Sequence, residues 1–294
     1  MHSQLEALLV LLFDTDSFVS ENAYQALVGM GGRILPDLQR YVDHATDIST
    51  MEQELVEDVI FDIHLNKILR HLEHWATFRN NDLWEGLCLV NNIICPELSF
   101  YNAKKMLDII YQTMHNKITP LHTPNKAVCY MNEVFFKEQQ YKAQTDRSNP
   151  QLYFVSDVIS GHLGSDLLIT ALYYLLARRL QLRSWLFELD NNVVMLGFEN
   201  TRQYKFTSSL EKNYKIGFYL YPPQEGRRYL LSEITPDAVL LRNSDVYLPI
   251  NHVRLLQLII ENLAITYQTN HAFKRSKSLS YTAQQLTPFA LLLP

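Results

Sequence analysis

The sequence has few cysteines, no excess of charge of one sign and no long hydrophobic run. Its 294 residues include only 3 cysteines. No Cys-x-x-Cys pair occurs among them, which argues against a disulfide framework or a zinc ribbon. The 26 basic and 31 acidic side chains nearly balance and leave a net charge of −5. The one basic cluster, KRSK at 274–277, is too short for a nucleic-acid-binding or membrane-binding stripe. We therefore expect no metal, no cofactor, no nucleic-acid partner and no membrane partner.

Hydrophobic runs are short even where the sequence is most apolar. The opening stretch, MHSQLEALLVLLFDTD, falls well below the roughly 20 residues of a membrane span and lacks a basic leader with a small-residue cleavage site. Three cysteines cannot all pair within one chain, which favours a reducing, cytoplasmic location. Apolar side chains make up 47% of the chain, enough for a packed core.

The first half of the chain has the hydrophobic spacing of helices. Three short helices are expected within residues 1–48, the second with Ser17 as its N-cap and a stop at Gly31. Their rhythm resembles a HEAT-type helical segment. A long helix follows, for which Ser49 and Glu52 form a capping-box pattern. Further helices are predicted at 82–93, 101–115 and 123–138.

The second half combines one apolar helix with short β-type segments. The helix is predicted at 165–180, with Ser165 or Asp166 as its N-cap. β-branched and aromatic residues then predict an antiparallel meander. Its segments are 184–189, 192–199, 202–208 and 216–221, and helices are expected again at 232–241, 251–268 and 272–286. This order predicts an α+β fold.

Four blocks of the sequence carry a resemblance to a known family. They are CYMNEVFFKEQQY, NPQLYFVSDVISGHLGSDLLITALYYLLARRLQL, FYLYPPQEGRRY and HVRLLQLIIENLAITYQ, in this order. With them the chain resembles the bacterial SirB-type transglutaminase-like family, as a divergent member with N-terminal HEAT-like helices. The resemblance implies a papain-like core with an antiparallel sheet at 49–231. It also implies flanking helices, an N-terminal segment at 1–48 and a C-terminal segment at 232–294.

The same resemblance implies where a catalytic site would lie. A nucleophile would open the core helix, a histidine would follow on the next strand, and an acidic or amide residue on the strand after it. These positions align with Leu168, Asn192 and Tyr221. Leucine has no titratable group and asparagine is no base near neutral pH. The resemblance therefore implies a vestigial site and a catalytically inactive protein that acts as a protein-binding or scaffold module, with a protein or peptide partner.

Two alternatives stay open. The first is a cysteine- or serine-dependent hydrolase or transamidase with a displaced site, for which Cys129 and His162 are the best candidates. The second is a small-molecule or peptide pocket that uses Asn192 and Tyr221 as polar anchors. Because free cysteine is usually buried and inert, we expect Cys129 to lie in the core, and Cys88 likewise. Cys95, before Pro96, is the expected exposed thiol.

Three further patterns have a functional and a structural interpretation. His64, His71 and His74 fall within an arc of about 80° on the long helix, where they could bind zinc. We favour a solvated or partly packed face. The aromatic and lysine residues of the sheet segments could stack bases, but packing within the core is favoured. The apolar tail PFALLLP could dock elsewhere, and we expect it to pack on its own chain instead.

Overall fold

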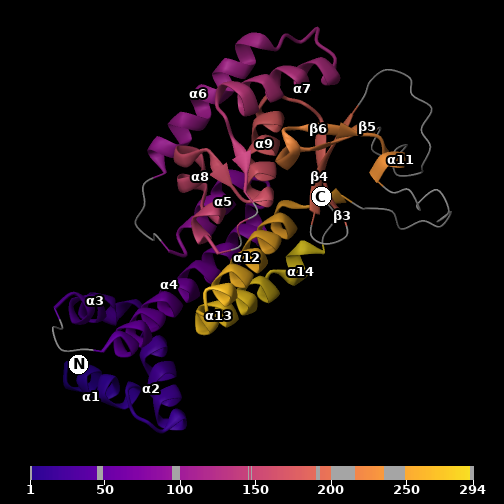
Figure 1. Ribbon diagram of the computed structural model, residues 1–294. Helices are drawn as coiled ribbons and strands as arrows, with labels where there is room; N and C mark the ends of the chain where they lie inside the picture. Colours follow the sequence, from indigo (N-terminus) through magenta and orange to yellow (C-terminus); the bar gives the residue numbers. More distant parts are fainter. Residues whose placement is uncertain are drawn as a thin grey trace.

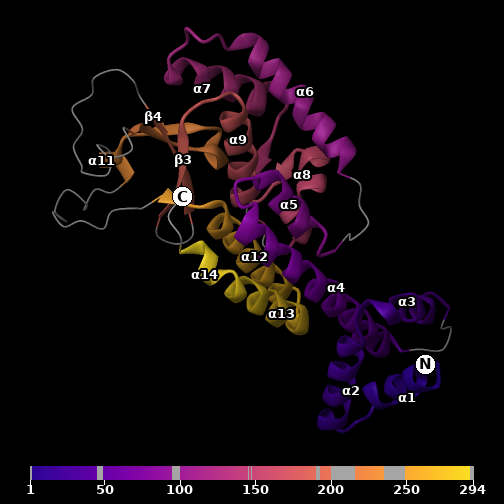
Figure 2. The same cartoon turned by 180° about the vertical axis from the view of Figure 1, so that it is seen from behind.

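The fold is α+β, with the long helices on one side of a five-stranded antiparallel sheet and a helical unit projecting from the body (Figures 1 and 2). The computed structural model describes residues 2–44, 49–94, 100–144, 146, 148–189, 193–199, 216–234 and 249–291. No helix within these ranges is both long and apolar enough to cross a membrane.

The projecting unit consists of α1 (His2–Leu12), α2 (Ser17–Met30) and α3 (Leu35–His44), which pack against the first half of α4 (Thr50–Phe78). These helices have a hydrophobic cluster of their own, which ends at Ile63 of α4. The second half of α4 belongs to the main core instead. Both views place α1–α3 at the far end of α4 from the sheet.

Local capping signals explain where these helices begin and end. The capping box predicted for α4 is confirmed, because the Ser49 side chain accepts from the Glu52 N–H and Glu52 accepts from the Ser49 N–H. α2 stops at Gly31, whose φ of 66° suits glycine. The prediction of Ser17 as N-cap is wrong by one residue. Asp16 is the cap, since its carboxylate reaches the Phe18 N–H at 2.8 Å.

Four further helices belong to the main body of the protein. They are α5 (Leu83–Asn91), α6 (Tyr101–Lys117), α7 (Pro124–Asn132) and α8 (Val155–Gly161). The helix predicted at 123–138 is confirmed, but it changes type after Asn132. From Glu133 to Glu138 the backbone forms a π-helical turn, η2, in which the Gln139 N–H reaches the Val134 carbonyl. Short strands β1 (Lys142–Ala143) and β2 (Leu163–Gly164) then pair in parallel.

The core helix α9 (Asp166–Arg179) lies against the sheet. The strands are β3 (Ser184–Leu189), β4 (Val193–Glu199), β5 (Ile216–Tyr221), β6 (Arg227–Tyr229) and β7 (Pro249–Ile250), in the order β6-β5-β4-β3-β7. The predicted meander is confirmed for β3, β4 and β5, whereas the strand predicted at 202–208 lies outside the described residues. Phe198 and Phe218 stack across β4 and β5 with ring centroids 5.3 Å apart, which confirms the packing role expected for the sheet aromatics.

C-terminal helices cover the other side of α9. After α11 (Leu231–Ile234), the chain forms α12 (His252–Thr269), α13 (Phe273–Gln285) and α14 (Thr287–Ala290). Phe289 and Ala290 pack on the main core, and the Phe289 carbonyl accepts a 2.8 Å hydrogen bond from Asn251. The prediction that the tail packs on its own chain is therefore confirmed up to Ala290.

α13 also contacts α4 and so connects the two ends of the chain. Arg275 donates to the carboxylate of Asp58 at 2.6 Å. Its neighbour Lys274 lies 4.1 Å from the centroid of the Tyr24 ring, which belongs to α2. The projecting unit is thus attached to the body by the continuous helix α4 and by these charged contacts.

Candidate functional site

The start of α9 is the position where the resemblance places a nucleophile. Ser165 is the N-cap, as predicted, and its hydroxyl accepts a hydrogen bond from the Leu168 N–H at 3.3 Å. The Leu168 side chain is fully buried in the main hydrophobic core. The first turn therefore presents a cap and an apolar anchor, and Leu168 cannot attack a carbonyl.

Tyr221, at the end of β5, reaches the same first turn. Its hydroxyl donates a 2.9 Å hydrogen bond to the carboxylate of Asp166. Burial raises the pKa of Tyr221 well above its usual value, and the Asp166 carboxylate beside it adds to this rise. The phenol is therefore a neutral donor near neutral pH. Asp166 stands at a helix N-terminus, where the helix dipole favours its negative charge.

Of the three aligned positions, the structure brings Tyr221 and the turn containing Leu168 together. Asn192 lies outside the described residues. The Tyr221 hydroxyl is engaged by Asp166, so it is not a free anchor for the small-molecule pocket that was one alternative.

Two turns further along α9, a second polar contact joins the helix to the turn after β5. The Tyr173 hydroxyl donates to the Asn132 side-chain oxygen at 2.7 Å, and the Asn132 amide donates to the Gly226 carbonyl at 3.0 Å. Gly226 has a φ of +69°, and a Cβ on it would lie 2.2 Å from the Asn132 oxygen. Only glycine fits this close approach. The sequence analysis does not identify Asn132. The available signal was a single asparagine in the otherwise largely apolar stretch MNEVFF.

These groups form one face of α9, which we call the α9 seam: Asp166, Thr170 and Tyr173 on the helix, with Tyr221 and Asn132 opposite. The three helical positions fall on one side because they are four and three residues apart. The buried Thr170 hydroxyl has no hydrogen-bond partner in the part of the chain described above. The seam combines phenols, an amide, a hydroxyl and one carboxylate, which can orient and hold groups but provide no thiolate or imidazole for acyl transfer.

Cys129 is exposed, so the prediction that it lies in the core is wrong. α7 buries Ala127, Val128 and Met131, and the helical rotation turns Cys129 to the opposite side. The thiol is close enough to Tyr173 to contribute, after burial, to the raised pKa of that phenol. His162 caps α8 in a left-handed conformation and stacks on Tyr141 at 4.7 Å. Across the residues that the structure describes, no hydrogen bond joins Cys129 to an imidazole.

Cys88 and the histidines considered as candidate sites have the structural roles that we favoured for them. Cys88 is partly buried, and burial raises the pKa of its thiol to about 12, as expected of an inert cysteine. His71 and His74 are exposed and His64 is half-buried, which confirms the solvated face predicted for them. No cluster of three metal-binding side chains occurs among the described residues. Cys95 lies outside them.

A buried helix whose N-terminus meets the ends of an antiparallel sheet defines the class of this domain as α+β with a helix-on-sheet core. The sequence profile of the transglutaminase-like superfamily matches residues 101–234, from the start of α6 to the end of α11. The chain therefore contains a transglutaminase-like superfamily domain at these residues. No curated protein and no solved structure matches the chain. The domain limits predicted at 49–231 stay a prediction.

Proposed function

We propose that the transglutaminase-like domain no longer performs acyl transfer and that the protein acts as a binding or scaffold module for a protein or peptide partner. In this proposal the chain is a cytoplasmic, SirB-type bacterial pseudoenzyme, and α1–α3 are a HEAT-like segment. The single observation that carries the proposal is the fully buried Leu168 at the start of α9.

Acyl transfer requires a nucleophile, a base that activates it and a group that orients the base. Leu168 provides no nucleophile. The Tyr221 phenol keeps its proton, because burial and the Asp166 carboxylate both raise its pKa, so it cannot replace a base near neutral pH. The hydrogen bond between Tyr221 and Asp166 also lies over the helix start, where a substrate carbonyl would have to approach.

Exposed apolar side chains on the projecting unit support the binding role. Val10 on α1 is 71% exposed and Phe18 on α2 is 76% exposed. Neither side chain belongs to the hydrophobic cluster of the projecting unit. Isolated exposed apolar residues are common, but large ones on a projecting helical unit suit contact with a protein. The two free thiols, Cys88 and Cys129, agree with a reducing compartment.

The rival function is a thiol-dependent hydrolase or transamidase centred on Cys129. One observation favours it, namely that this thiol is exposed rather than buried. Among the described residues no hydrogen bond joins this thiol to an imidazole, and His162 is stacked on Tyr141. A catalytic assay with matched variants separates the two functions.

The assay uses the full chain with a glutamine-containing peptide and a primary amine, and separately with an activated ester. We expect no turnover above that of a blank without protein, and no change in Cys129→Ser, in His162→Gln or in Cys88→Ser, the control at the partly buried thiol. Turnover that Cys129→Ser abolishes would establish the rival function and end the pseudoenzyme proposal.

The binding role is tested by quantitative co-purification from a bacterial lysate. We expect one protein to be retained by the wild type in a stoichiometric amount, and its retention to fall in the double variant Val10→Asp/Phe18→Asp. The control is Leu121→Asp, because Leu121 is 94% exposed and lies outside the projecting unit. Equal retention by all three proteins would show that Val10 and Phe18 of α1 and α2 are not part of the binding surface.

A further inference from the structure

A pocket of about 350 Å³ lies at the opposite end of α9 from the seam. α6, the 118–122 loop, α7 and the segment that leaves α9 enclose it. Because α9 has 14 residues, the rise of a helix places the pocket about 20 Å from Asp166. The pocket is therefore separate from the position of the aligned catalytic residues. Its volume falls within the range typical of small-molecule sites.

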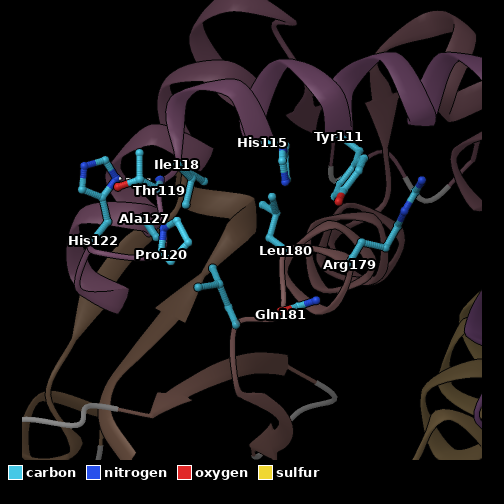
Figure 3. Close-up of a pocket in the computed structure, with 11 residues that line it drawn as sticks. Tyr111, His115, Ile118, Thr119, Pro120, His122, Ala127, Arg179, Leu180 and Gln181 are labelled. Atoms are coloured by element: carbon cyan, nitrogen blue, oxygen red, sulfur yellow. Dashed lines mark hydrogen bonds between the residues drawn. The ribbon is translucent and has the colours of Figure 1, made fainter.

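The two ends of the pocket differ in character (Figure 3). Tyr111 and Arg179 stand at one end, with Gln181 below them, whereas the other end holds Ile118, Thr119, Pro120 and His122. Ala127 of α7 stands at this second end too, and Leu182 also lines the pocket. Such a pocket suits a ligand with an apolar body and one polar group.

The polar end is rich in hydrogen-bond donors. None of the described lining residues is acidic. The Arg179 guanidinium lies 4.5 Å from the centroid of the Tyr111 ring and donates to Asp108 at 2.6 Å, which fixes its position. Arginine has several further N–H donors beyond the one that Asp108 uses. His115, between the two ends, carries at least one N–H in either tautomer. The Arg179 N–H groups that Asp108 does not use favour a negatively charged ligand group.

Gln181 provides an independent observation at the same end. Its φ is 60°, a left-handed conformation that strains any residue with a Cβ and suits glycine. The position closes α9, since the Leu182 N–H reaches the Ala177 carbonyl at 3.0 Å. Glycine would therefore form the better cap, and a glutamine there adds a side chain that lines the pocket.

We propose that this pocket binds a small organic monocarboxylate. The carboxylate lies against Arg179 and Gln181, and the apolar body lies against Ile118, Pro120 and Leu182. A planar guanidinium is the side chain best suited to a carboxylate, because its N–H groups match the two carboxylate oxygens. This site is independent of the proposed binding role of α1 and α2.

The probes are benzoate and two molecules of nearly the same shape, the neutral benzamide and the cationic benzamidine. Binding is followed by ¹H–¹⁵N correlation spectra of the full-length chain. We expect benzoate to shift the backbone amides of Ile118, Thr119 and residues 180–182 in a saturable manner. Benzamide should bind at least several-fold more weakly, and benzamidine should not bind there.

Three variants test the placement of the carboxylate. Arg179→Met should weaken benzoate binding about tenfold, the loss expected of one charge-assisted contact. Asp108→Asn should strengthen it, because it removes the anion that competes for the guanidinium. Gln181→Gly should weaken binding while raising the melting temperature, which separates a loss of contact from a loss of folding. Arg178→Met, on the neighbouring exposed position, is the matched control and should bind as the wild type does.

Equal binding of benzamide and benzoate would overturn the proposal, as would unchanged benzoate affinity in Arg179→Met. Equal or weaker binding in Asp108→Asn would contradict the placement of the carboxylate beside Arg179. Saturable shifts confined to residues outside the pocket would overturn the site itself.

Discussion

The Tyr221 hydroxyl donates a 2.9 Å hydrogen bond to the Asp166 carboxylate and so ties the end of β5 to the first turn of α9. The two residues are 55 positions apart in the chain. The Ser165 hydroxyl caps the Leu168 N–H of the same turn.

Removing the Tyr221 hydroxyl should destabilise the fold. We expect Tyr221→Phe to lower the free energy of unfolding by about 1–2 kcal/mol, the usual cost of losing a hydrogen bond to a charged group in a half-buried place. Urea unfolding measures the change. Tyr281→Phe, at an exposed phenol, should change stability by less than about 0.5 kcal/mol. Equal effects of the two variants would show that the contact with Asp166 contributes nothing.

A side chain at Gly226 should be costly. Gly226→Ala places a Cβ 2.2 Å from the Asn132 oxygen and also strains a φ of +69°, so we expect a loss of more than about 2 kcal/mol. Gly31→Ala isolates the backbone effect, because Gly31 has a φ of +66° with nothing within 4 Å of the added Cβ, and should cost about 1 kcal/mol. If both substitutions cost the same, the contact with Asn132 is unimportant.

The pH dependence of stability should include a contribution from His252. Burial lowers the pKa of His252 below its ordinary 6.5, and the hydrogen bond to the Asn80 carbonyl offsets this only in part. The unfolded chain therefore binds a proton more readily than the folded chain, so stability falls as the pH drops below about 6.5. We expect His252→Gln to reduce the slope of unfolding free energy against pH between about pH 7 and 5. His71→Gln, at an exposed histidine, is the control. An unchanged slope in His252→Gln would contradict the prediction.

The contact between α13 and α4 should stabilise the attachment of the two ends of the chain. In a double-mutant cycle of Arg275→Met and Asp58→Asn, we expect a coupling energy of about 1–2 kcal/mol, because both side chains are mostly buried. The pair of Arg40 and Asp37, in which the Arg40 side chain is 66% exposed, should give less than about 0.5 kcal/mol. A coupling energy no larger for Arg275 than for Arg40 would show that the α13 contact is only a surface pair.

Elements with strong local signals could be predicted from the sequence. The capping box of Ser49 and Glu52 marks the start of α4, and the cap Ser165 marks the start of α9. The strands β6 and β7 have only 3 and 2 residues and were missed, because such short strands exist only through pairing with β5 and β3. The α+β class could be predicted from the order of the longer helices and strands alone.

The site could be predicted only in part. The alignment with the family blocks indicated Leu168 and Tyr221; Leu168 lies in the first turn of α9, and the Tyr221 hydroxyl at the end of β5 reaches Asp166 of that turn. That these positions form a vestigial site stays a prediction. The partnership of Asn132 with Gly226 spans 94 positions, so no local pattern could reveal it. The burial expected of Cys129 was wrong because an apolar neighbour on each side does not fix which face of a helix a residue occupies.

The division of α4 between two hydrophobic clusters has a mechanical consequence. A single helix of 29 residues is about 43 Å long and rigid along its axis. A partner bound to α1 and α2 would therefore lie at a fixed distance and orientation from the domain that contains α9. A rotation of α1–α3 and the first half of α4 relative to α13 would have to break the ion pair between Arg275 and Asp58.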